Sequence, residues 1–174
     1  MKERQKQNRA DKIGLEYAKL LLERKGCKVT ITGASGLIEV ASAGGSNKST
    51  IAVNTIVDGT LTGNIGVLVG QNINGRIIPA GAMVSPAEYY VFVVAGHSGV
   101  YGIETPKLRQ LIQDHKYTSI ETTDEELNRI AVFRQQVLLE NCEHVPSPPK
   151  LFQPLQVVQP IKAIEKVKSV GPRK

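Results

Sequence analysis

The stretch that decides the fold is residues 31–59, which read ITGASGLIEVASAGGSNKSTIAVNTIVDG. Residues 37–40 and 50–57 within it are rich in aliphatic and β-branched side chains and predict two β-strands. The residues between them, Gly44-Gly45-Ser46-Asn47, tolerate positive φ, so they predict a turn that folds the two strands into a hairpin. A helix is expected before this hairpin, and strands and helices after it. The predicted fold is therefore α/β (α+β), with the hairpin central to a mixed β-sheet flanked by helices.

Length and composition indicate one ordinary globular domain. The chain has 174 residues, of which 41% are hydrophobic and 22% charged, enough to bury a core. No run reaches the ~18 apolar residues that a membrane span needs, and the first residues lack the apolar segment of a secretory signal. Cys27 and Cys142 have neither zinc-site spacing nor a disulfide framework, so we expect reduced thiols in a cytoplasmic protein.

The net charge of +6 is concentrated at the two ends of the chain. Residues 1–28 contain nine basic and four acidic residues, and residues 150–174 contain six and one. Basic ends are suited to contact with a phosphate backbone, because that attraction does not depend on base sequence, and they are equally consistent with a role in solubility alone. The candidate nucleic-acid-binding residues are Arg9, Lys12, Lys48, Arg76, Lys162, Lys166 and Lys168.

The first half of the chain predicts a helix and several strands around the hairpin. Residues 7–25 repeat apolar side chains at helical spacing, and Gly26 is placed to end that helix. Residues 27–32 alternate as a short strand. Residues 60–82 alternate turn signals with short apolar runs and predict short strands or an ordered loop.

The second half predicts another hairpin and then helices. Val91-Phe92-Val93-Val94 is typical of a strand buried on both faces, and residues 100–103 form its return strand. Thr105 is the expected cap of a helix with Pro106 in its first turn. A further helix is predicted from Thr122 or Thr123 to about Asn141, with Leu127, Ile130, Phe133, Val137 and Leu138 at helical spacing. Residues 1–145 form the predicted domain, and residues 146–174 a proline-rich, lysine-rich tail or arm.

Three stretches resemble the PD-(D/E)XK nuclease superfamily, the fold of many restriction enzymes, Holliday-junction resolvases and homing endonucleases. The first is the opening helix, which carries Gly14 and Glu16 and ends in Lys25-Gly26. The second is the hairpin, in which residues 36–38 and 51–55 have the spacing of the family's metal-binding strands. The third covers residues 87–105, which are similar to the strands and helix start of resolvase-like members.

The resemblance implies a fold whose chemistry is lost. In the family, acidic groups on the two strands hold Mg²⁺, which activates water, and a nearby lysine steadies the developing charge. At the matching positions this chain has Gly36 for the aspartate, Ala52 for the glutamate and Asn54 for the lysine; only the helix glutamate, Glu16, is present. We therefore expect a catalytically inactive, restriction-endonuclease-like protein without a cofactor. It would bind DNA or a DNA-processing partner, as a homodimer.

Two other functions remain open. One is an active Mg²⁺-dependent endonuclease whose ligands have moved, with Glu16 and Asp58 as the available carboxylates. The other is a scaffold or interaction protein that binds no nucleic acid. His97 and Ser98 stand together in Gly-His-Ser-Gly, but adjacent residues of a tight turn rarely face each other. We therefore interpret this segment as a polar turn.

Overall fold

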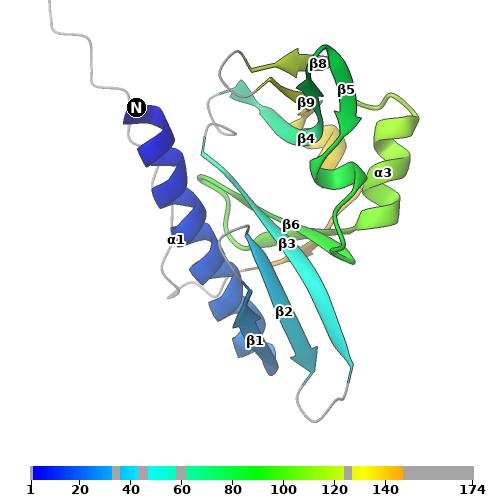
Figure 1. Ribbon diagram of the computed structural model, residues 1–174. Coiled ribbons are helices and arrows are strands. Elements are labelled where there is room, and N and C mark those ends of the chain that lie inside the picture. Colours follow the sequence, from blue (N-terminus) through cyan, green and yellow to red (C-terminus); the bar gives the residue numbers. More distant parts are fainter. Residues whose placement is uncertain (1, 33–35, 43–46, 58–61, 124–126, 147–174) are drawn as a thin grey trace, which may run out of the picture.

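The computed structural model describes residues 2–32, 36–42, 47–57, 62–123 and 127–146, with the side chains described from residue 8 onward. They form two β-sheets and a small number of helices (Figure 1). The residues between these ranges lie outside the description, as do 147–174. The three candidate DNA-binding lysines of the predicted tail, Lys162, Lys166 and Lys168, are among the latter.

The first sheet is mixed and has six strands. In spatial order they are β1 (Cys27–Ile31), β2 (Leu37–Ser42), β3 (Lys48–Ile56), β6 (Tyr89–Val94), β7 (Val100–Glu104) and β10 (Glu143–Val145). β3 and β6 pair parallel, and every other neighbouring pair is antiparallel. The predicted hairpin is confirmed as β2–β3, and its second strand is central to the sheet.

The second sheet is antiparallel and has four strands in the order β5-β4-β9-β8. They are β4 (Asn64–Ile73), β5 (Arg76–Pro79), β8 (Ser119–Thr122) and β9 (Asn128–Arg134). β4 and β5 are joined by Asn74 and Gly75, whose φ angles of 52° and 77° are those of a type I′ turn. Of the short strands or ordered loop predicted for residues 60–82, the structure has strands, one of them ten residues long, and the 3₁₀ turn η1 (Gly81–Met83) follows them.

Three α-helices are described: α1 (Lys2–Arg24), α3 (Thr105–Gln113) and α4 (Gln135–Leu139). α1 ends just before Gly26, whose φ of 85° suits glycine, as the sequence predicts. Pro106 lies in the first turn of α3, also as predicted. The cap of α3 is Glu104, however, and not Thr105, which is buried inside the helix start.

The helix predicted from Thr122 or Thr123 to Asn141 is wrong for most of its length. Residues 128–134 form β9, and only α4 is helical. The spacing of Ile130 and Phe133 imitates a helix, but Phe133 and Ala131 alternate along β9 and pair with Ile65 and Val67 of β4. This pairing buries both side chains completely and overrides the local pattern.

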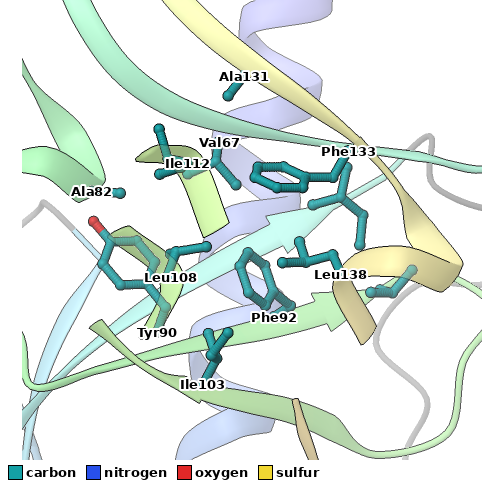
Figure 2. Packing of buried hydrophobic residues seen from close by; sticks show 12 residues of the cluster. Val67, Ala82, Tyr90, Phe92, Ile103, Leu108, Ile112, Ala131, Phe133 and Leu138 are labelled. Atoms are coloured by element: carbon teal, nitrogen blue, oxygen red, sulfur yellow. The ribbon is translucent and has the colours of Figure 1, made fainter. Parts of the chain in front are cut away.

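Two cores lie on opposite faces of the six-stranded sheet, and β6 contributes to both. Val91 and Val93 pack toward α1, whereas Tyr90 and Phe92 pack toward the second sheet. Figure 2 shows Phe92 reaching from β6 toward Phe133 of β9. The prediction of a strand buried on both faces is therefore confirmed, and the two sheets and α1 form successive layers (Figure 1).

Candidate functional site

Of the three positions expected to have lost their ligands, Ala52 and Asn54 lie on β3, and Gly36 directly precedes β2, opposite Val53. Leu37 is the register partner of Ala52, and the backbone N–H of Val53 donates to the carbonyl of Gly36 at 2.8 Å. Gly36 has a φ of 71°, and a Cβ there would meet the Val53 carbonyl oxygen at 2.9 Å. Only glycine fits this position without strain, so the local backbone itself disfavours an aspartate.

Ala52 and Asn54 face the second sheet. Ala52 packs against the core between the sheets, and the Asn54 Nδ2 group approaches the carbonyl of Gly66 on β4 at 3.5 Å. The side chains of Ile51 and Val53 alternate to the other face and pack with α1. The Ala52 side chain is therefore used in packing and that of Asn54 in an amide contact, and neither residue offers a carboxylate.

Glu16 does not join these positions. It is an exposed residue of α1, which contacts the sheet through Tyr17, Ala18 and Leu21 on the face opposite Ala52. The sheet therefore separates Glu16 from Ala52 and Asn54. Asp58, the second carboxylate considered, lies outside the described residues. Within the described ranges no three His, Cys, Asp or Glu side chains are grouped so that they could hold a metal ion.

The candidate DNA-binding residues are spread over different elements. Arg9 and Lys12 are exposed on α1, whereas Arg76 is exposed at the start of β5 in the other sheet. Lys48 begins β3 and forms an ion pair with Glu39 at 3.3 Å. These described cations do not form one patch.

Lys28, which the sequence analysis did not single out, lies in line with Lys48 across the sheet. Lys28 of β1 is the register partner of Ala41, and Ala41 is the partner of Lys48. The three residues form a row across β1, β2 and β3, which we call the lysine row, on the face away from α1. At ~4.8 Å per strand the two lysine backbones are about 10 Å apart. Because Ala41 is small, both ammonium groups can reach one polyanion above the sheet. The alternation of residues 27–32 predicts the direction of Lys28, but only the strand register brings it into line with Lys48.

His97 makes contacts that a simple turn would not. Its Nδ1 lies 3.1 Å from the hydroxyl of Tyr101, and its Nε2 contacts the amide of Gln135 at the start of α4. His144 of β10 stacks on Tyr101 with ring centroids 4.6 Å apart, and its Nε2–H donates to the carbonyl of Ser98 at 2.8 Å. The cluster ties the β6–β7 turn to α4 and β10, and it does not pair His97 with the Ser98 hydroxyl.

The phenol of Tyr101 and the thiol of the nearby Cys142 have raised pKa values. Burial raises the pKa of Tyr101, and the nearby Cys142 adds to the effect. Burial also raises the pKa of Cys142 to about 11, against the opposing influence of Lys107. A thiol and a phenol of raised pKa are poor nucleophiles near neutral pH.

Comparisons with known proteins do not assign this chain to a family. No protein-family model, curated protein or solved structure matches the chain. None of the helices in the described ranges is long and apolar enough to cross a membrane.

Proposed function

We propose that this protein is a catalytically inactive nuclease-fold protein that binds the phosphate backbone of DNA. One observation carries the proposal: the positions matched to the nuclease ligands are neighbours on β3 and just before β2, yet they bear a hydrogen, a methyl group and a carboxamide. The central place of the hairpin in a mixed sheet, with α1 on one face, supports the nuclease-like reading of the fold.

The donor set explains why hydrolysis is not expected. Mg²⁺ binds through carboxylate and phosphate oxygens in near-octahedral geometry, and its charge lowers the pKa of the attacking water. Gly36 and Ala52 supply no side-chain oxygen, and Asn54 supplies one neutral amide. Glu16 is on the other side of the sheet. A cation held by one neutral oxygen would not activate water.

We place the proposed contact with DNA at the lysine row. Phosphate contacts attract any sequence, and each one lost lowers the salt dependence of binding. Lys28 is exposed and has no ion pair among those described, whereas Lys48 is shared with Glu39. We therefore expect Lys28 to contribute more than Lys48.

DNA binding is tested by fluorescence anisotropy with labelled duplex and branched DNA at several salt concentrations. The proposal expects binding to both, with an affinity that falls steeply as salt rises. Replacement of Lys28 and Lys48 by Gln should reduce the slope of log K against log salt by about 1–2 units, since about 0.9 unit is lost per phosphate contact and Lys48 is shared with Glu39. Lys116→Gln, which removes another exposed lysine, beyond the end of α3, is the matched control and should change the slope little.

Two results would redirect the proposal. An absence of binding at low salt would favour the interaction protein that needs no nucleic acid. Nicking of plasmid DNA with Mg²⁺ or Mn²⁺, lost on Glu16→Ala, would favour the active endonuclease with relocated ligands. If the wild-type protein binds and does not cut, but the double lysine variant binds equally well, the function stands and the contact surface lies elsewhere.

A further inference from the structure

The outer edge of β5 exposes large apolar side chains to solvent. β5 is the first strand of the four-stranded sheet, and all four of its residues are exposed. Ile77 and Ile78 are 59% and 45% exposed, and Ile73 at the end of β4 is 48% exposed. A strand edge with apolar side chains on both faces is an unusual surface to leave in water.

The hairpin register shows which backbone groups of β5 point outward. Ile73 and Arg76 flank the two-residue turn and are partners, as are Gln71 and Ile78. In such a hairpin these pairs exchange hydrogen bonds with each other, while the intervening residue points its N–H and C=O away. Ile77 is that residue. The N–H of Asn72, its partner on β4, also points away from β5 and donates to the carbonyl of Leu127 at 2.8 Å, as this alternation requires.

The outward groups suit a short, self-complementary pairing. Ile77 offers one donor and one acceptor, and Pro79 offers a carbonyl without an N–H. A long partner strand would therefore lose a hydrogen bond at Pro79. The β5 strand of a second copy, running antiparallel, needs only the outward hydrogen-bonding groups of Ile77. Each Ile77 N–H then donates to the Ile77 carbonyl of the other copy.

Charge also favours two antiparallel copies. Arg76 is the one charged residue of β5, and antiparallel pairing centred on Ile77 places the two Arg76 residues on either side of the axis, each opposite Ile78 of the other copy. A parallel arrangement would set the two arginines directly side by side. The opposite edge of the same sheet, β8, carries Ser119 and Glu121 and has no comparable exposed isoleucines.

We propose that β5 is a dimer interface, at which two copies of this chain pair antiparallel about a two-fold axis through Ile77. The two four-stranded sheets then become one continuous sheet. Ile77 of each copy then lies beside Ile77 of the other on one face, and Ile78 lies beside Arg76 of the other copy on the opposite face. Such closed two-fold contacts are the commonest form of homo-oligomer. The proposal does not depend on DNA binding.

Ile77→Pro tests the backbone part of this proposal. It removes the outward N–H but no hydrogen bond within the hairpin, and proline is tolerated at such edge positions. Sedimentation velocity over a concentration series should show a monomer–dimer equilibrium for the wild type and a monomer for the variant, with unchanged circular dichroism. Leu20→Ser, which removes another exposed apolar side chain, on α1, is the matched control and should leave the equilibrium unchanged.

A cross-linking experiment keeps the test independent of how well the proline variant folds. Directly opposed, hydrogen-bonded residues have Cα atoms about 5.5 Å apart, within disulfide range. In a background with Cys27 and Cys142 replaced by Ser, Ile77→Cys should therefore form a disulfide-linked dimer on mild oxidation, and Val84→Cys, also highly exposed, should not. A wild-type protein that stays monomeric at every concentration, or an Ile77→Cys variant that does not cross-link, would overturn the proposal.

Discussion

Substitution of Gly14 by alanine tests the contact that sets the orientation of the whole candidate site. Gly14 is buried in α1, and a Cβ built on it would collide with the hydroxyl and methyl groups of Thr55 on β3. This close approach places Thr55 on the α1 side of the sheet. By strand alternation it places Ala52 and Asn54 on the other side, away from Glu16.

The expected magnitude follows from two opposing effects. Alanine is favoured over glycine inside a helix by about 1 kcal/mol. Forcing a methyl group into a filled space costs about 1–3 kcal/mol. We therefore expect Gly14→Ala to lower the free energy of unfolding by about 1 kcal/mol, and to lower Tm by about 2–4 °C for a chain of this size.

The matched control is the same substitution in a Thr55→Ala background. Removal of the hydroxyl and methyl groups takes away the two closest contacts but leaves the Cβ of residue 55 at 3.0 Å from the new methyl group, so Gly14→Ala should destabilise the protein less in this background than in the wild type. Urea unfolding followed by circular dichroism measures all four proteins of the cycle. If Gly14→Ala stabilises the wild-type background, or costs the same in both backgrounds, α1 does not pack on β3 as described, and the separation of Glu16 from Ala52 and Asn54 no longer holds.

Three further outcomes are expected. Phe133→Ala should lower the free energy of unfolding by about 3–5 kcal/mol in urea titrations, because the ring is fully buried between the sheets; a loss under 1 kcal/mol would contradict its place on β9. Gly99→Ala should cost about 1–3 kcal/mol and raise hydrogen exchange in β10, since Gly99 has a φ of 91° and a Cβ would strike the Val145 carbonyl; unchanged exchange would refute this. In a Cys27→Ser variant, burial that raises the pKa of Cys142 to about 11 should make its alkylation slow at pH 8 and faster as pH rises toward 11; a rate equal to that of an unfolded peptide thiol would count against it.

Much of the fold could be predicted from local signals. The end of α1 at Gly26, the β2–β3 hairpin and the doubly buried strand β6 follow from turn chemistry and hydrophobic period. The strand at residues 128–134 could not be predicted in this way, because the spacing of its apolar residues fits a helix as well as a strand. Long-range pairing with β4 decides between the two, and that information is not in the local sequence.

In the candidate site, too, some features follow from the sequence and others only from the tertiary structure. The sequence alone determined that Gly36, Ala52 and Asn54 carry no carboxylate, since residue identity is independent of the fold. Only the tertiary structure decided that these residues are neighbours, that Glu16 lies across the sheet from two of them, and that Lys28 lines up with Lys48. Strand register and the choice of sheet face are fixed by contacts between distant segments. A shift of one residue would reverse every side chain, so these features exist only once the sheets have assembled.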